Sequence, residues 1–416
     1  MKLQFPNLKY TDATFWTIFA LLIFVSSLAL FSASSTLVYK SNSPFGTVGG
    51  QIAFMLIGVV VAFGLQFLPS KYIRLGGYAL FVVSLVMVYS LLIPNNPFIA
   101  KINGEGRWLK LFGVRFQPSE LVKLSLVIVV ADMLSRAKTD KEKKKYFFIT
   151  LGITAFAAAP ILVSNFSTAF LLCGVVFLLW VLGRIPWQYL VSTAAIVAVV
   201  AVVGFCIADF GYVRKGKELP IFSRAETWIK RIDRYQGGIV SDDKTAEVKI
   251  TDANRQEVYA TVAIARGGIS PIGVLPGNSK ERDYLPLAFA DYIFAIIVEE
   301  SGLVGAIFVI FLYLSLLGRA CITSTKFSDM SAMLMVMGLA LMITCQALMS
   351  MWVAVGLMPV TGQPLPFISK GGTSVLVTSV YLGIMMCVSR EQSMLLDRQK
   401  ATIDASENDV PDIEVE

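Results

Sequence analysis

The chain has 416 residues, of which 56% are hydrophobic and 16% charged, and its mean hydropathy is +0.68. This composition is too apolar for a soluble protein of this size, and it predicts a polytopic membrane protein. The net charge of +7 does not indicate a nucleic-acid partner, because the basic residues lie mostly in short loops between apolar segments. Five cysteines without a CxxC pair, and no histidine, argue against zinc chemistry, histidine-based catalysis and a disulfide framework.

Apolar segments of bilayer-spanning length predict about ten transmembrane helices. The first segment lacks a small-residue cleavage site, so we interpret it as a retained helix and not as a signal peptide. The segments lie at about residues 14–34, 48–68, 76–93, 118–134, 146–163, 168–183, 188–208, 291–317, 332–354 and 372–388. The expected fold class is therefore an all-α polytopic integral membrane protein with one large extracytoplasmic loop.

Cations gather in alternate connections between these segments, which places both termini in the cytoplasm. The cytoplasmic set includes the cluster from Arg136 to Lys145 and the stretch from Arg390 to Lys400. We expect residues 1–395 to form the transmembrane domain and the acidic residues 396–416 to form a disordered cytoplasmic tail.

Two connections on the opposite side are longer and more polar. Residues 95–116 interleave aromatic and basic side chains, as in an interfacial segment at lipid headgroups. In this segment Arg107 offers a bidentate phosphate donor beside Trp108, although the pair taken alone favours ordinary interfacial anchoring. The second connection, about residues 209–290, contains a glycine-rich stretch that ends at Lys280. Such a stretch brings backbone N–H groups close to phosphate oxygens, but it matches neither a P-loop nor a dinucleotide fingerprint.

Asp291 is the focal residue of a polar stretch that runs directly into an apolar segment. The carboxylate is expected at the mouth of a hydrophobic helix, where a low dielectric suits a general base. Glu299 and Glu300 follow roughly two and a half turns later. Each is either a second carboxylate of the same site or a partner in an ordinary ion pair.

Two further motifs place charge at membrane depth. Glu120 opens the fourth predicted helix and Lys123 follows three residues later, so acid and base share one face. Ionisable groups in this position are usually functional, and the alternative is a buried ion pair that only fixes helix packing. Residues 356–374 are too rich in proline and glycine for a lipid-exposed helix, so they are expected to form a re-entrant or outer loop packed on protein. Lys370 would then direct a cation toward the same outer cavity as Asp291.

Taken in order, these blocks resemble the SEDS (shape, elongation, division and sporulation) family of integral membrane peptidoglycan glycosyltransferases. The resemblance covers nearly the whole chain. It is carried by the stretches NGEGRW, FQPSELVK, QEVYATVAIARGG with ADYIFAIIVEESGLVG, and GLMPVTGQPLPFISKGGTS. It implies polymerisation of undecaprenyl-linked lipid II into glycan at the outer face of the bacterial inner membrane. A class B penicillin-binding protein, the transpeptidase, and other division proteins are the implied partners. The resemblance places the catalytic aspartate at Asp291 and the motif glutamate and lysine at Glu120 and Lys123.

The chain departs from the usual pattern of that family at three places. Phe289 and Ala290 stand where a histidine and a threonine usually precede the aspartate, and Lys370 stands where a tyrosine is usual. Asn165 stands where an aspartate is usual, which removes one possible metal ligand.

The resulting hypothesis is an inverting glycosyl transfer. Asp291 removes the proton from the 4-hydroxyl of the acceptor sugar, and the lipid pyrophosphate leaves. Candidate substrate-binding residues are Arg107, Trp108, Glu120, Lys123, Lys280 and Lys370, and the cations among them would balance the developing charge. No cofactor is evident, although a divalent cation such as Mg²⁺, held by Asp291 or Glu120, fits the same chemistry.

Three alternatives stand beside this hypothesis. A lipid II flippase needs a polar cavity among helices as much as a polymerase does. A structural scaffold for a penicillin-binding protein would leave the intramembrane acids without a role. Within the family, the polar termini and Lys370 favour the division branch over an elongation-type polymerase.

Overall fold

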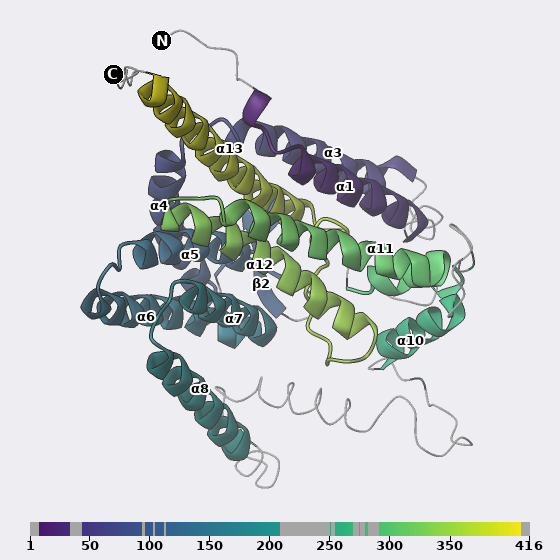
Figure 1. Cartoon of the computed structure of the whole chain (residues 1–416). Helices are drawn as coiled ribbons and strands as arrows, with labels where there is room; N and C mark the ends of the chain where they lie inside the picture. Colours follow the sequence, from purple (N-terminus) through teal and green to yellow (C-terminus); the bar gives the residue numbers. More distant parts are fainter. Residues whose placement is uncertain are drawn as a thin grey trace, which may run out of the picture.

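The computed structural model describes residues 8–33, 44–93, 96–102, 105–111, 114–208, 250, 254–268, 274, 279–281 and 291–408. These residues are mostly helical (Figure 1). After a short 3-10 helix, η1 (Leu8–Tyr10), the helices are α1 (Ala13–Ala33), α3 (Pro44–Leu65), α4 (Ser70–Ser90), α5 (Pro118–Ser135), α6 (Asp140–Ser164), α7 (Phe166–Leu182), α8 (Trp187–Ala208), α10 (Arg255–Gly267), α11 (Ile293–Ser324), α12 (Met330–Ala354) and α13 (Gly372–Asn408).

Every predicted apolar segment coincides with one of these helices, and α10 lies within the predicted large loop. Six helices of the described part, namely α1, α4, α6, α11, α12 and α13, are long and apolar enough to cross a membrane. The chain is therefore a multi-pass membrane protein, as its composition predicted.

Local sequence signals fix where the helices near the site begin. Pro118 occupies the first turn of α5, where its missing N–H breaks no helical hydrogen bond. Thr139 and Glu142 form a capping box at the start of α6. The side chain of Asn165 caps α7 by accepting a hydrogen bond of 3.3 Å from the backbone N–H of Thr168. These starts place Glu120 and Asn165 in or beside the first turn of their helices.

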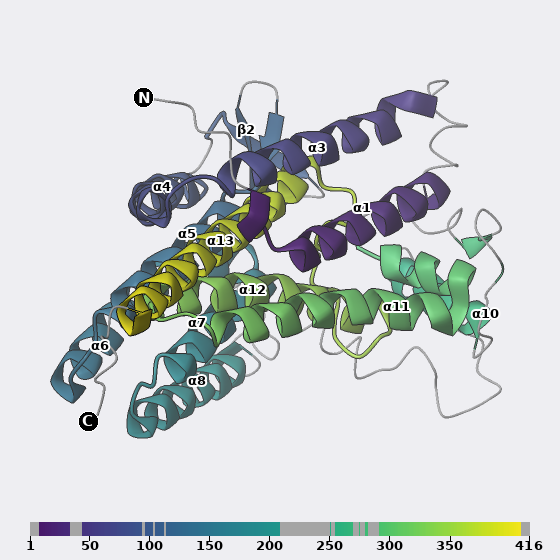
Figure 2. The same cartoon turned by 45° about the horizontal axis from the view of Figure 1, so that its top comes forward.

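Two C-terminal helices form the centre of the bundle. In the apolar stretch that could span a membrane, the buried share is 78% for α12 and 72% for α13. The same share is 28–39% for α1, α4, α6 and α11. Figures 1 and 2 show α12 and α13 between the α1–α3 side and the α5–α7 side of the bundle. Small residues at the α3–α13 contact, where Gly58 meets Ser379 and Gly383 meets Ala62, let the two backbones approach closely.

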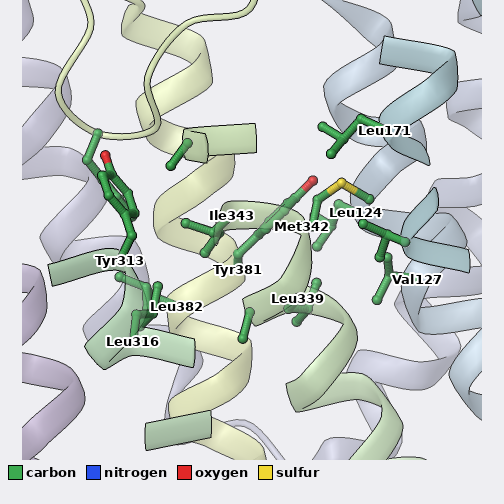
Figure 3. Packing of buried hydrophobic residues seen from close by; sticks show 14 of the residues in the cluster. Leu124, Val127, Leu171, Tyr313, Leu316, Leu339, Met342, Ile343, Tyr381 and Leu382 are labelled. Carbon is green, nitrogen blue, oxygen red and sulfur yellow. The ribbon is translucent and has the colours of Figure 1, made fainter. Parts of the chain in front are cut away.

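The core below the candidate site is closely packed and apolar. In Figure 3 side chains of α5, α7, α11, α12 and α13 meet, among them Leu124, Leu171, Leu316, Met342 and Leu382. This packing holds the ends of five helices in fixed relation, so the residues at those ends are held as well.

The expectation of an all-α protein was wrong for residues 95–116, which were expected to form an interfacial segment. They contain a three-stranded antiparallel sheet of β1 (Ile99–Ile102), β2 (Glu105–Leu111) and β3 (Val114–Phe116), in the order β1-β2-β3. In β2 the buried Leu109 alternates with the exposed Lys110, the period-two pattern of a strand. The interleaved aromatic and basic residues therefore indicated a strand as much as an interface.

The C-terminal boundary also differs from the expectation. Helix α13 continues to Asn408, so residues 396–408 of the predicted disordered tail are helical. Residues 390–408 contain neither glycine nor proline, so nothing in the sequence ends the helix there. Residues 409–416 and most of the predicted loop 209–290, including Phe289 and Ala290, lie outside the described residues.

Ion pairs lie at the end of the bundle remote from Glu120. Arg319 of α11 pairs with Asp12, which precedes α1, at 2.9 Å. Arg136, the residue after α5, pairs with Asp132 of that helix at 2.5 Å, and Tyr78 of α4 donates a hydrogen bond of 2.8 Å to the same carboxylate. Arg136 lies 16 residues after Glu120, roughly 24 Å along the helix axis. The basic residues of the predicted cytoplasmic loops thus also help to hold the helix ends together.

Candidate functional site

A buried ion pair forms the base of the candidate site. Oε1 of Glu120 and Nζ of Lys123 are 2.7 Å apart, and the two side chains are 8% and 0% exposed. Lys123 also donates a hydrogen bond of 2.6 Å to Oε1 of Gln346 on α12. Tyr381 of α13 donates to the backbone carbonyl of Glu120 at 3.4 Å. The prediction that Glu120 and Lys123 share one face of the helix is confirmed. Gln346 of α12 supplies a further hydrogen-bond partner, which a buried charge requires.

The loop between α12 and α13, residues 355–371, covers this pair. It is packed on protein, as its proline and glycine content predicted, since Leu365 and Ile368 are 1% and 0% exposed. Hydrogen bonds fix it to four helices through the side chains of Ser26 (α1), Gln51 (α3), Thr168 (α7) and Gln346 (α12). The bond from Gln346 Nε2 to the carbonyl of Pro364 is 3.1 Å long, so Gln346 connects Lys123 directly to the loop.

The loop backbone is strained at Phe367. This residue has a φ of 66°, in the left-handed region that bulky side chains rarely adopt, and it is 2% exposed. Its ring centroid lies 5.2 Å from that of Phe19, and its carbonyl accepts a hydrogen bond of 2.8 Å from Ser26. Strain of this kind persists only where the surroundings over-determine the conformation, a feature common at ligand-binding loops.

Arg107 reaches the same loop from strand β2. A β-carbon on Gly362 would lie 3.3 Å from Nη1 of Arg107, so the guanidinium lies directly against this glycine. Lys123 reaches Pro364, two residues away, through Gln346. Loop residues 362–364 are therefore reached by Arg107 directly and by the Glu120–Lys123 pair through Gln346. Trp108 follows Arg107 in the strand, pairs with Ala100 and faces the other side of the sheet.

A second group of charges is organised around Glu299 of α11, whose side chain is 0% exposed. Its carboxylate accepts hydrogen bonds from the hydroxyl of Ser279 and, at 3.1 Å, from the backbone N–H of Lys280. Nη1 of Arg266 on α10 lies 3.8 Å from Oε1 of Glu299. The backbone of Lys280 is thus anchored while its side chain is exposed. Glu299 takes part in an ion pair with Arg266, which is one of the two roles predicted for it.

Asp291 lies two residues before α11 begins and is half-buried. The next residue, Tyr292, is 1% exposed. Helix α11 is broken at Gly302, whose φ of 63° and ψ of −155° are not helical. Glu299 and Glu300 therefore belong to a short N-terminal piece of α11, which Asp291 precedes and which is distinct from the rest of the helix. Glu300 accepts a hydrogen bond from Ser32 of α1, which joins this piece to the bundle.

Lys370 ends the covering loop. It is half-buried, and burial lowers the pKa of its ammonium group. The following backbone N–H, that of Gly371, donates to Oε1 of Gln51 at 3.3 Å. Lys370 is thus held near the start of α13, on the same loop that Arg107 and Gln346 contact.

The residues around Glu120 do not fit a metal ion. Within the described ranges no group of three or more cysteine, aspartate or glutamate side chains converges, and Glu120 is already neutralised by Lys123 at 2.7 Å. A bound ammonium takes the position that a cation would need. We therefore derive no step through a metal ion.

Sequence reasoning missed three site residues: Thr168, Gln346 and Gln363. Each is a neutral polar residue, and two of them lie within apolar helices. An amide inside a membrane-spanning segment is a signal in itself, because burying it without a partner costs free energy. The sequence does not show which partner it has.

Comparison with known proteins identifies the class. The FtsW/RodA/SpoVE family model, described as "Cell cycle protein", matches residues 12–394, and the chain belongs to this family. It is 28% identical to the probable peptidoglycan glycosyltransferase FtsW of Marinomonas mediterranea, over 90% of this chain and 87% of that protein. It is 27% identical to the peptidoglycan glycosyltransferase MrdB of Escherichia coli K12, over 95% of this chain and 97% of that protein.

The fold agrees with the family. A chain of the solved structure titled "Structural coordination of polymerization and crosslinking by a peptidoglycan synthase complex" superposes with a TM-score of 0.70, covering 92% of this chain and 98% of that one at 23% identity. The protein is thus a multi-pass membrane enzyme of the FtsW/RodA/SpoVE family. More particularly, it is a peptidoglycan glycosyltransferase.

Proposed function

We propose that this enzyme polymerises lipid II at the outer face of the membrane, with Asp291 as the general base. The observation that carries the proposal is the convergence of Arg107 and the buried Lys123 on loop residues 362–364. A guanidinium on this loop and a buried ammonium linked to it through Gln346 suit a ligand with concentrated negative charge, such as a lipid pyrophosphate.

In the proposed reaction the 4-hydroxyl oxygen of the acceptor sugar attacks the anomeric carbon of the donor. Asp291 accepts the hydroxyl proton, and the bond from the anomeric carbon to the pyrophosphate oxygen breaks. Arg107 and Lys123 stabilise the negative charge that develops on the leaving pyrophosphate. Glu120 keeps Lys123 charged and oriented by pairing with it at 2.7 Å. Lys280 and Lys370 are further candidates for contact with phosphate.

The rival functions make different demands on Asp291. A lipid II flippase needs neutralising charge along a passage, whereas a polymerase needs a base at the outer mouth. A scaffold needs neither, and it leaves the buried Glu120–Lys123 pair without a task beyond packing.

We further propose a division role and a class B penicillin-binding protein as the partner. The relatives include proteins named FtsW as well as MrdB, and the solved relative above comes from a complex that couples polymerisation to crosslinking. In this proposal the ten apolar helices all cross the membrane, both termini lie in the cytoplasm of the bacterium, and no nucleic acid takes part.

The test is polymerisation of purified lipid II with and without the cognate transpeptidase. Asp291→Asn keeps the shape of the side chain and removes the base, so glycan synthesis should fall below detection while expression and partner co-purification persist. Asp397→Asn, a half-exposed acid paired with Lys9, is the matched control and should retain full activity. Near-normal glycan on the gel from Asp291→Asn sinks the assignment of the base. Translocation of labelled lipid II without polymer favours the flippase.

A further inference from the structure

Three buried polar side chains lie together beside the charged pair and have no place in the mechanism above. They are Asn165 at the start of α7 and Thr361 and Gln363 of the covering loop, and their exposed fractions are 7%, 6% and 3%. In each of them one polar atom lacks a partner among the described residues: Nδ2 of Asn165, Oγ1 of Thr361 and Oε1 of Gln363.

Contacts bring these residues into one subsite. Nε2 of Gln363 donates a hydrogen bond to Oγ1 of Thr168, and the backbone N–H of Thr168 donates to Oδ1 of Asn165 at 3.3 Å. Thr168 therefore holds both amides, one from each side. Gly362, between Thr361 and Gln363, lies against Arg107.

The unpartnered atoms include a donor, Nδ2 of Asn165, and an acceptor, Oε1 of Gln363. A backbone N–H can only donate, so the bond from Thr168 assigns the oxygen of the Asn165 amide to that bond and leaves its NH₂ group for another partner. Gln363 donates its NH₂ group to the hydroxyl of Thr168, and its carbonyl oxygen remains.

Leaving such groups buried and unpaired is unfavourable, and native proteins rarely retain several in one place without a ligand. Other buried polar atoms of the described residues, such as Nε2 of Gln66, also lack a partner, so the contacts that join Asn165 and Gln363 through Thr168 are what point to a ligand.

We propose that Asn165 and Gln363 bind the acetamido group of the donor sugar. A secondary amide offers one carbonyl oxygen and one N–H, which complement the NH₂ of Asn165 and the carbonyl of Gln363. The inference rests on the proposed lipid II activity. In the donor sugar the acetamido group and the pyrophosphate are on adjacent ring carbons. In the loop, Gln363 stands between Gly362, which Arg107 contacts, and Pro364, which Lys123 reaches through Gln346. Asn165 and Gln363 are thus specificity-determining residues that orient the ring while the cations hold the leaving group.

The experiment compares natural lipid II with an analogue in which a hydroxyl replaces the acetamido group of the muramoyl sugar. The replacement keeps the sugar neutral and removes the amide. For two neutral hydrogen bonds we expect the native enzyme to prefer natural lipid II by about tenfold to hundredfold in kcat/KM. Gln363→Leu should lower kcat/KM for natural lipid II and leave the value for the analogue nearly unchanged, so that the preference falls toward one.

Gln66→Leu is the matched control. Gln66 is also a buried glutamine with an unpartnered atom, but its carbonyl accepts from Trp16 between α1 and α3, away from the loop. This variant should keep the native preference even if it melts earlier. A Gln363→Leu enzyme with the native preference overturns the proposal, as does a native enzyme that uses both substrates equally well. In that last outcome lipid II polymerisation itself still stands, whereas the absence of any polymer from natural lipid II rejects the proposed function.

Discussion

The Glu120–Lys123 pair should behave as one energetic unit, and a double-mutant cycle measures this. The pair is 2.7 Å apart with Lys123 fully buried, so removal of either partner leaves an uncompensated charge at membrane depth. The variants are Glu120→Gln, Lys123→Met and the double variant.

The contacts set the expected order of the effects. Glu120→Gln leaves Lys123 with an oxygen acceptor and its bond to Gln346, so the loss in unfolding free energy should be about 3 kcal/mol, the lower end for a broken buried pair. Lys123→Met leaves both the carboxylate and Oε1 of Gln346 without their donor, and the loss should approach about 5 kcal/mol. The double variant leaves only neutral groups, the oxygen of Gln346 and the amide introduced at position 120, at about 1–3 kcal/mol.

Unfolding free energies of the purified variants in mixed detergent micelles, by titration with a denaturing detergent, give the cycle directly. The sum of the single losses should exceed the loss in the double variant by about 5 kcal/mol or more. A double variant whose loss equals that sum refutes the coupling. Polymerisation measured on the same samples separates stability from activity, because the stable double variant should still be inactive.

Three further predictions concern the covering loop and the N-terminal piece of α11. Lys370→Tyr should raise the apparent KM for lipid II with little change in melting temperature, whereas Lys370→Arg should retain most activity; an unchanged KM with earlier melting would indicate a protein carboxylate as its partner. Gly362→Ala should lower kcat because its φ of 65° and the nearby Arg107 both resist a β-carbon, whereas Gly356→Ala, with a φ of 75° and open space, carries the backbone strain alone and should leave activity intact. Equal losses in the two glycine variants would remove Arg107 from the explanation. Glu299→Gln should speed hydrogen exchange in residues 255–267, because it removes the charge that faces Arg266, and protection equal to that of the native chain would count against this.

The sequence alone determined the class of the fold and the family. Spanning helices need long apolar runs because the bilayer offers no hydrogen-bond partners to the backbone, so every predicted run coincides with a helix. The sequence also identified the Glu120–Lys123 pair, because a spacing of three residues along a helix places two side chains on one face. Local alternation in residues 99–116 carried a strand signal as well, but the aromatic and basic residues were equally compatible with an interface.

Only the tertiary structure decided which distant residues meet. Arg107 of a strand, Thr168 of α7 and Gln346 of α12 converge on one loop because each is fixed by the packing of its own element, and no local pattern encodes that convergence. Composition alone did not show whether the residues after 395 form a helix or a tail, and α13 continues to Asn408. It also did not show that the helix from Ile293 is broken at Gly302. The role of a buried polar side chain depends on its hydrogen-bond partner, and for Lys123 the partner Gln346 lies 223 residues away in the sequence.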